Sequence, residues 1–574
     1  MAHAALSSNA RGAGGAGGAG SAGRAGGARE SPGRAGLLPR VAGSIWCALV
    51  LWLLVSNLFA PSYGVFRYET WAAVLAGAAV LALTLAVPWL LELLDTLLRF
   101  GWLRVLGSLL GWGAVFAVLA RLADAVRLPP DWDAAAVYYS AYGLAEQGIP
   151  EATDRTYYQT NPNNLLLMML LSRYLGAAEA LGSQDLRQSA AYLNAALLFG
   201  GMLLTYAAAA MLGGRRTARL SLVPSLALIL LSPWLPVFYS DTAGLPFTIA
   251  IFCLLLLAGR CRLAARLLLW AAAGAVSAVG YGIKPTVLIV LAAASLVALL
   301  SVRRASWRKD LTAGLLSIAA AGAAFTGTHA AVDAWGRASG VLAEGVPANQ
   351  YALPATHFLK VGVQQYPGPN GDYYGAYNEE DRSSTLAVAD PQERFDAALQ
   401  TWLDRVADRG PAGYAGFLNA KLRWITGDGS FFSWGEGRMG AGDFIADDPF
   451  SRAVQDFYGP GHAGFPLLQN LWQGTWFLVL GLCGAGLFLR GPPLNSPGVV
   501  TARIALLGLF VFLMLSEGRA RFLYLYLPFF LVLGSLSLQR LVPAKWGVPA
   551  PRQLSRQHRH RDAPPPSTPA EVVE

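Results

Sequence analysis

Residues 71–94 read WAAVLAGAAVLALTLAVPWLLELL, an apolar run in which Glu92 is the only charged residue. A helix needs about 20 mainly apolar residues to cross the hydrocarbon core of a bilayer, and this run exceeds that length. Runs of similar character recur between residues 42 and 541. The sequence therefore predicts an all-α polytopic membrane protein.

The composition of the chain agrees with this class. Of the 574 residues, 54% are hydrophobic and 14% are charged, whereas about 25% of the residues in ordinary soluble domains are charged. The cysteines show neither a disulfide framework nor the spacing of metal ligands. We expect them to be small packing residues within or beside the apolar runs: Cys47, Cys253, Cys261 and Cys483.

The apolar runs divide the chain into twelve predicted membrane spans. These are residues 42–60, 71–94, 104–124, 190–212, 218–237, 243–259, 265–282, 286–302, 310–332, 466–489, 500–516 and 521–541. One further run, Asn163 to Leu175, is short. We interpret it as a half-helix that enters the membrane and returns; the alternative is a thirteenth span whose partner is not recognised.

Charge is distributed unevenly along the chain, which carries a formal net charge of +9. The segment from Asp333 to Asp456 contains 17 acidic and 10 basic residues, a balance of −7, and the remainder carries +16. Lys and Arg are retained in cytoplasmic loops. Placing the amino terminus inside puts every strongly basic turn on one side. We therefore expect a multi-pass protein of the cell membrane with both termini cytoplasmic, and no nucleic-acid partner.

The spans and the charge imply a division of the chain into five regions. We expect residues 1–40, rich in Gly, Ala, Ser and Arg, to be a disordered cytoplasmic arm, and residues 542–574 to be a disordered cytoplasmic tail. Residues 41–332 form an amino-terminal bundle with a first outer loop at 125–189. Residues 333–465 form a mixed extracytoplasmic domain, which includes a helix from Pro391 to Arg409, and residues 466–541 form the last spans.

Two aspartates follow the third predicted span in the sequence Pro129-Pro130-Asp131-Trp132-Asp133. A carboxylate at a membrane surface accepts a proton from a hydroxyl nucleophile when its neighbours hold it ionised and aimed. Asp131 is also suited to cap the helix expected over residues 134–147. Capping explains one acid and not both, so we interpret the pair as a candidate catalytic site.

A third acid, Asp241, lies in the short outer turn between two apolar runs, within Tyr239-Ser240-Asp241-Thr242. An ionisable group between membrane helices is costly and is a functional candidate. The alternative is a helix cap for the following span.

Three cations depart from the expected charge distribution: Lys284, Arg519 and Arg521. All three map to the outer mouth of the bundle. An anionic ligand such as a lipid phosphate or diphosphate gives a reason to keep them there, because Arg offers a forked pair of donors. The alternative is that these side chains extend to lipid head groups.

Several short motifs together resemble the membrane glycosyltransferases of the C-type fold, in particular the protein O-mannosyltransferases and bacterial aminoarabinose transferases. These motifs are the acidic first outer loop, Asn161-Pro162 before a short helix, Tyr239-Ser240-Asp241-Thr242, Lys284-Pro285 and Glu517-Gly518-Arg519-Ala520-Arg521. The long segment resembles a Gram-positive branch of this group through Pro354-Ala355-Thr356-His357-Phe358, Gly375-Ala376-Tyr377-Asn378 and Lys421-Leu422-Arg423-Trp424 leading to Asp428-Gly429. The resemblance covers most of residues 42–541.

The resemblance implies an enzyme that moves a sugar, with inversion, from a polyprenyl phosphate donor to an acceptor on the outer face. It implies Asp133 as the catalytic base, with Asp131 as the alternative. The family pattern has adjacent acids, whereas Trp132 intervenes here, so the choice of base and a divalent-metal requirement stay open. Lys284, Arg519 and Arg521 would hold the donor phosphate, and Asp241 would orient a hydroxyl or a neighbouring cation.

Further residues are weaker candidates for contact with the sugar or the acceptor. They are Tyr158, Asn161, His357, Tyr377, Asn378, Lys421 and Trp424. Aromatic rings stack on sugars, but they also form the cores of small domains, and both interpretations apply to those in residues 333–465.

Two other classes of protein compete with the transferase. A multi-pass transporter or lipid flippase also uses charged residues in a helical bundle, but such proteins usually show repeated halves or broken helices at the membrane midplane. We find no clear repeat, and the charged candidates gather at one mouth. A structural envelope protein leaves the two aspartates and the three cations unexplained.

Overall fold

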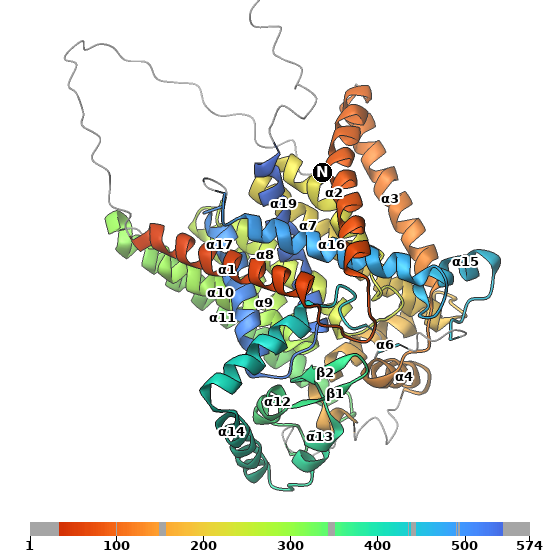
Figure 1. The fold of residues 1–574 in the computed structure, drawn as a ribbon, viewed down its shortest axis with the longest axis vertical. Coiled ribbons are helices and arrows are strands. Elements are labelled where there is room, and N and C mark those ends of the chain that lie inside the picture. The colour runs from red at the N-terminus through yellow and green to blue at the C-terminus, as the bar shows by residue number, and fades with distance from the viewer. Residues whose placement is uncertain are drawn as a thin grey trace, which may run out of the picture.

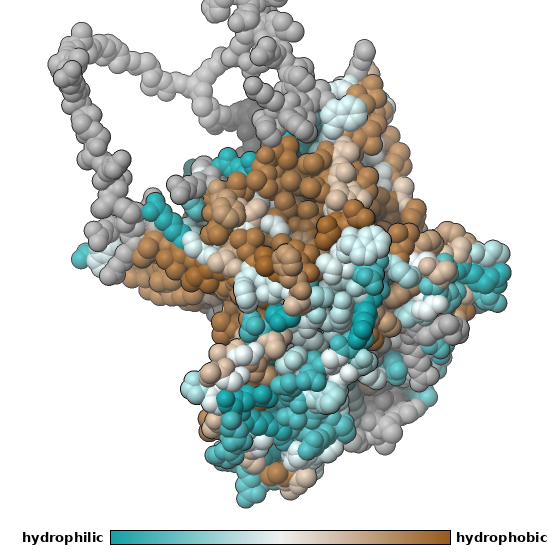
Figure 2. Space-filling model, in the orientation of Figure 1, coloured by the Kyte–Doolittle hydropathy of each residue, from teal (hydrophilic) through white to brown (hydrophobic). Residues whose placement is uncertain are grey.

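The computed structural model describes residues 34–98, 100–148, 157–302, 304–342, 350–433, 436–437, 443–489, 491 and 494–542. Apolar helices form one part of the molecule, and a smaller polar part with α12, α13, α14 and a hairpin lies at one end of them (Figure 1). Figure 2 shows hydrophobic residues over the helical part and hydrophilic residues over the polar part. The chain is therefore an all-α membrane protein with a mixed polar region, as predicted.

The helical part contains most of the long elements. Their bounds are α1 Arg34–Phe59, α2 Thr70–Leu97, α3 Gly101–Ala125, α7 Leu186–Ser225 with η2 Leu226–Leu230, α8 Ser240–Ala258, α9 Leu263–Ile283, η3 Pro285–Val287 with α10 Leu288–Leu300, η4 Arg304–Ser306 with α11 Trp307–Ala338, α16 Phe465–Ala485, α17 Pro497–Leu515, α18 Arg521–Tyr524 and α19 Leu527–Leu541.

The polar end contains the remaining helices and both strands. These are α4 Trp132–Gln147, η1 Pro162–Asn164, α6 Leu165–Ala180, α12 Ala355–Gly362, β1 Gln365–Gly368, β2 Gly371–Tyr374, α13 Glu379–Leu386, α14 Pro391–Thr426 and α15 Pro449–Tyr458. The two strands pair antiparallel, with Gln365 opposite Tyr374. The predicted helix from Pro391 to Arg409 forms the first half of α14, which breaks at Gly410, where φ is 60°.

Each of the twelve predicted spans coincides with a helix, but the number of long apolar helices is smaller. Among the described residues, eight helices are long and apolar enough to cross a membrane, and Pro285–Leu300 and Leu527–Leu541 are shorter. The predicted span 190–212 and residues 218–230 of the next one fall in one element, Leu186–Leu230, which bends at Gly214, where φ is 80°. Glycine adopts this left-handed conformation without strain. Residues 231–237 of the second span are not helical. The helix α16 carries Gln469, Asn470 and Gln473 in its first half and is not among the eight.

Close packing of small residues positions the helices. The oxygen of Gly474 in α16 lies 2.7 Å from the position that a Cβ on Gly77 in α2 would take. Small residues allow membrane helices to approach this closely, because their backbones come into direct contact. A side chain at either glycine would force α2 and α16 apart.

Segments predicted to lie outside the membrane gather at one end of the bundle. The indole nitrogen of Trp234 donates to the oxygen of Phe431 at 3.2 Å, and the amide of Glu517 donates to the oxygen of Phe358 at 2.8 Å. The short run at 163–175 also lies at this end and forms most of α6, which is largely buried and is not among the eight long apolar helices.

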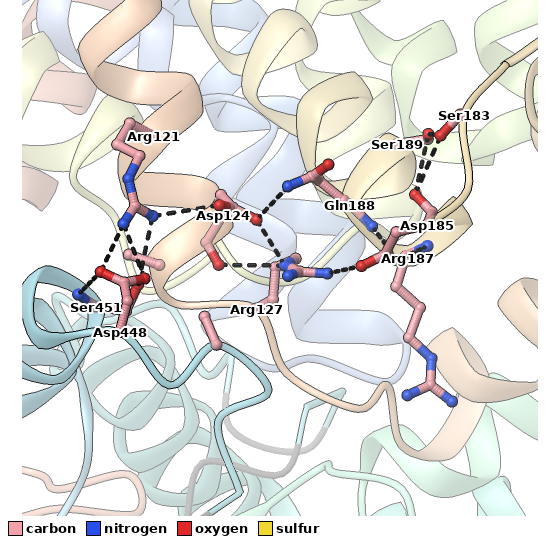
Figure 3. A network of polar contacts seen from close by, with 12 residues as sticks. Arg121, Asp124, Arg127, Ser183, Asp185, Arg187, Gln188, Ser189, Asp448 and Ser451 are labelled. Carbon is pink, nitrogen blue, oxygen red and sulfur yellow. Dashed lines mark hydrogen bonds and ion pairs between the residues drawn. The ribbon is translucent and has the colours of Figure 1, made fainter. Parts of the chain in front are cut away.

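Arginine–aspartate pairs join α3, α7 and α15 at the same end (Figure 3). The Nη2 atom of Arg121 lies 2.8 Å from Asp448 Oδ1. The Nε atom of Arg127 lies 2.8 Å from Asp124, and its Nη1 atom contacts Asp185 at 2.5 Å. Beyond the three cations predicted at this end, Arg121 and Arg127 are two more, and aspartates neutralise them.

Candidate active site

Asp133 accepts hydrogen bonds from two tyrosines. The hydroxyl of Tyr157 donates to its Oδ1 at 2.8 Å, and the hydroxyl of Tyr239 donates to its Oδ2 at 3.1 Å. The amide nitrogen of Asn164 donates to the same two hydroxyls, at 2.7 and 3.3 Å. Because each hydroxyl oxygen accepts a hydrogen bond from the Asn164 side chain, its own proton is directed at the carboxylate. Burial, together with the charge of Asp133, raises the pKa of Tyr157, which keeps this hydroxyl a donor.

The two candidate aspartates lie at the start of α4 but have different contacts. Asp131 is the N-cap of α4, and its side chain accepts from the Trp132 amide at 3.1 Å. Trp132 has a φ of 45°, a conformation that non-glycine side chains rarely adopt and that often marks functional sites. Asp131 thus takes the capping position that was its alternative interpretation, while Asp133 faces the tyrosines.

Glu436 completes the same cluster, and the sequence analysis missed it. Its Oε2 atom accepts from the Ala134 amide at 3.1 Å, and its backbone oxygen accepts from the Asp131 amide at 2.9 Å. Its other carboxylate oxygen forms an ion pair with Arg521. Burial, opposed by the charge of Arg521, raises the pKa of Glu436. The only signal in the sequence is a single acid between glycines in Gly435-Glu436-Gly437.

A buried turn that begins at Asp428 precedes Glu436 in the chain. The carboxylate of Asp428 accepts from the amides of Ser430 and Phe432, at 2.8 and 3.0 Å. Phe431 and Phe432 follow with φ of 55° and 50°. Phe431 packs on Trp476 and Tyr524, and Glu436, a few residues further along the chain, lies beside the start of α4.

Asp241 and Lys284 form a buried ion pair between the starts of α8 and η3. Asp241 is fully buried and Lys284 is 6% exposed. The Oδ2 atom of Asp241 has no hydrogen-bond partner among the described residues. Buried polar atoms are usually paired, so this carboxylate oxygen retains unused capacity to accept a hydrogen bond.

Arg519 and Arg521 approach the cluster from the segment between α17 and α18. The Arg519 guanidinium lies 4.7 Å from the ring centre of Phe432 and 5.9 Å from that of Trp132, and it donates to the Tyr377 oxygen at 3.3 Å. Arg521 lies 5.8 Å from the ring centre of Tyr239. The Nε atoms of both arginines are buried without a hydrogen-bond partner in the described part of the chain.

The ion pairs of this site revise the inference that the cations at the outer mouth require an anionic ligand. Lys284 pairs with Asp241 and Arg521 pairs with Glu436, so neither cation needs an anionic ligand to explain its position. Their role in binding phosphate stays a prediction. Arg519 has no ion pair of hydrogen-bonding length with an acid among the described residues; it contacts two aromatic rings, the Tyr377 oxygen and the Tyr366 hydroxyl, and it interacts electrostatically with Glu517.

Most of the predicted acceptor contacts lie inside the polar region. A ring nitrogen of His357 lies 3.0 Å from the Thr385 hydroxyl, and Asn378 caps α13. Lys421 donates to the oxygens of Gly362 and Ser516 at 2.7 and 2.6 Å, and burial lowers its pKa to about 7. Of the candidates in this region, Tyr377 contacts a residue of the cluster, through its backbone oxygen and Arg519.

Tyr158, Asn161 and Trp424 serve local structure in this arrangement. Tyr158 is buried, and its hydroxyl donates to the Ala136 oxygen at 3.5 Å. Asn161 precedes η1 and donates to the Tyr157 oxygen at 3.2 Å. Trp424 is buried, with its ring centre 5.3 Å from that of Tyr373. Asn161 therefore supports the Tyr157 segment that faces Asp133.

The described residues contain no group of three or more His, Cys, Asp or Glu side chains that is suited to hold a metal ion. The carboxylates of Asp241 and Glu436 are instead paired with Lys284 and Arg521. The two paired carboxylates do not fit a bound divalent metal, and the reaction proposed for this site does not use one.

The fold and the site define a polytopic integral membrane protein with buried, ion-paired acids and bases at one end of its bundle. Residues 48–542 match the family described as "Conserved hypothetical integral membrane protein", and the chain belongs to that family. No curated protein matches the chain.

A solved structure of the archaeal oligosaccharyltransferase AglB from Archaeoglobus fulgidus, in complex with an inhibitory peptide and a dolichol-phosphate, is similar to this chain at 11% identity and a TM-score of 0.39. The match covers 79% of this chain and 52% of that chain. The present chain thus spans about half the length of that protein.

Proposed function

We propose that the protein is an inverting glycosyltransferase that moves a sugar from a polyprenyl phosphate donor to an acceptor on the outer face of the membrane. The observation that carries the proposal is the arrangement around Asp133. Its carboxylate is aimed by two tyrosine hydroxyls, and Arg521 lies over one of those two rings. A positioned base beside fixed positive charge is what attack by a hydroxyl with departure of a phosphate requires.

Asp133 acts as the general base in this proposal. Each carboxylate oxygen offers about two lone-pair sites, so both retain a site after accepting from Tyr157 and Tyr239. The acceptor hydroxyl gives its proton to Asp133 while its oxygen attacks the anomeric carbon. The bond between that carbon and the phosphate oxygen breaks, and the electron pair leaves with polyprenyl phosphate. Attack opposite the leaving group inverts the anomeric centre.

Arg519, Arg521 and Lys284 stabilise the charge that develops on the leaving phosphate. The unpartnered Nε atoms of the two arginines are available donors. Asp241 keeps Lys284 in place, and its free Oδ2 atom is suited to accept from a sugar hydroxyl. Tyr377, at the edge of the cluster, contributes to acceptor or sugar contact.

This function fixes the orientation of the chain. The site must face the outside, so residues 333–465 form an extracytoplasmic domain and both termini are cytoplasmic. At the opposite end of the bundle, Arg215 and Arg219 pair with Asp95. The proposed partners are membrane lipid, the lipid-linked sugar and an acceptor that is a protein, a lipid or a wall polymer.

A transfer assay tests the proposal. The purified full chain in lipid vesicles receives radiolabelled polyprenyl phosphate sugars, one donor at a time, together with envelope extract. We expect the label to move to one class of acceptor, with release of polyprenyl phosphate and inversion at the anomeric carbon. Absence of transfer from every donor, combined with substrate-dependent flux across the vesicles, would instead identify a transporter or flippase.

A further inference from the structure

A cleft lies at the end of the bundle opposite Asp133. Its volume is about 570 Å³, within the roughly 300–1,000 Å³ typical of small-molecule sites. The cleft is formed where α1 and α17 begin and α16 ends. It is separate from the candidate active site, because α17 begins here and reaches Arg519 only beyond its other end. Its lining residues are Pro39, Arg40, Gly43, Ser44, Gly486, Leu487, Leu489, Gly491, Leu494, Asn495 and Arg503.

Arg503 is the most informative residue of this cleft. It is 5% exposed, and its Nη1 atom donates to the Leu494 oxygen at 3.1 Å. Its Nε atom is buried without a hydrogen-bond partner among the described residues. The guanidinium lies against Gly43, where an added Cβ would be 2.7 Å from Nη1. A buried arginine with an unused donor is costly without an anion.

Positive charge in the cleft is not balanced by the described residues that line it, which include no Asp or Glu. Arg40 lines the same cleft. Neither Arg40 nor Arg503 forms an ion pair with a carboxylate within the described ranges. The opposite holds at the candidate active site, where Lys284 and Arg521 each have an acid partner.

We infer that this cleft between α1, α16 and α17 binds a phosphate group through Arg503 and Arg40. Arginine presents a fork of N–H donors that matches phosphate oxygens. Ser44 and Asn495 add polar groups, and the leucines of the lining accommodate an attached hydrocarbon. The phosphate belongs either to an anionic lipid headgroup or to a soluble phosphate ester, and the two sources share this recognition chemistry. The inference does not depend on sugar transfer.

Binding to the purified full chain in detergent tests the inference. The ligands are phosphatidylglycerol, phosphatidylcholine, glycerol phosphate and inorganic phosphate, and the readouts are bound lipid by native mass spectrometry and the shift in Tm. We expect Arg503→Gln and Arg40→Gln each to weaken binding by about tenfold, since a hydrogen bond to a charged group is lost. Arg308→Gln is the matched control, because it removes one charge outside the cleft, where Arg308 stacks on Trp307.

A second variant separates binding from folding. Gly43→Leu keeps every charge but displaces the Arg503 guanidinium, so it should weaken binding as Arg503→Gln does. Arg40→Gln should weaken binding while its gel-filtration profile stays that of the native chain, which shows that the loss is not caused by unfolding. Tighter binding of phosphatidylglycerol than of phosphatidylcholine assigns the lipid source. Arginine-dependent binding of glycerol phosphate or inorganic phosphate alone assigns a soluble source. Equal binding of all ligands by the native chain and the three variants would overturn the inference.

Discussion

Replacement of Asp133 by Asn is expected to lower the rate of sugar transfer by about 10²–10⁴-fold, the usual contribution of a positioned general base. Asn has the same shape, and its amide oxygen still accepts from one of the two tyrosines that aim this carboxylate. The amide cannot take up the proton of the acceptor hydroxyl. Donor binding should therefore persist, and single-turnover transfer with labelled donor should measure the loss.

Two matched variants serve as controls for this result. Asp333→Asn removes an exposed acid that pairs with Arg337 in α11 and should leave transfer unchanged. Asp131→Ala removes the cap of α4, which costs about 1 kcal/mol of stability, and should reduce stability more than it reduces the rate. Transfer by Asp133→Asn at the native rate would remove Asp133 from the role of base.

Arg521→Gln is the second variant with a large expected effect. Loss of one preorganised group that stabilises developing charge typically costs about 10²–10³-fold in kcat. The same change leaves Glu436 buried without its partner, and breaking a buried pair in this way costs about 3–5 kcal/mol of stability. A fall in activity alone would therefore not separate catalysis from folding.

The double variant Arg521→Gln with Glu436→Gln resolves this ambiguity. Both charges are then absent, so thermal stability should recover most of the loss, while the Gln oxygen still accepts from the Ala134 amide. Transfer should stay as low as in Arg521→Gln. If the double variant regains both stability and activity, Arg521 has a structural role and no catalytic one.

The class of fold could be predicted because the hydrocarbon core of a membrane imposes one length and one apolar composition on every helix that crosses it. A helix that crosses lipid needs about 20 mainly apolar residues, and residues 71–94 accordingly lie within α2, Thr70–Leu97. The count of spans was harder to predict. Gly214 bends a single helical element between two predicted spans, and residues 286–302 and 521–541 form shorter helices than their apolar runs indicate.

The candidate site could be predicted only in part, for a physical reason. Cations that depart from the charge pattern predict Lys284, Arg519 and Arg521 as site residues, and Asp241 is predicted because it lies between two apolar runs. Asp133 is predicted from the pair of acids after the third span and from the resemblance. The sequence does not show which residues from distant segments will contact these side chains. Glu436 bonds to Ala134 across 302 residues of sequence, and only the folded turn after Asp428 brings the two together.

Lys421 illustrates a second limit of the sequence. The resemblance carried by Lys421-Leu422-Arg423-Trp424 predicts that it contacts the sugar or the acceptor. The folded chain places its ammonium group on the backbone oxygens of Gly362 and Ser516. It therefore joins α12 and α14 to the segment that carries Arg519, a position that no local pattern predicts.

The central claim is that one outward-facing site collects Asp133, Arg519 and Arg521 and binds the lipid-linked sugar. The most direct measurement labels cysteines with a membrane-impermeant maleimide in sealed, right-side-out vesicles. Trp132→Cys replaces an exposed residue beside Arg519, and native Cys261, also exposed, lies in the turn between α8 and α9. We predict that position 132 reacts in sealed vesicles and is protected by a polyprenyl phosphate sugar, while Cys261 reacts only after the vesicles are opened. The reverse order of labelling, or reaction at position 132 without protection by any donor, would contradict the claim.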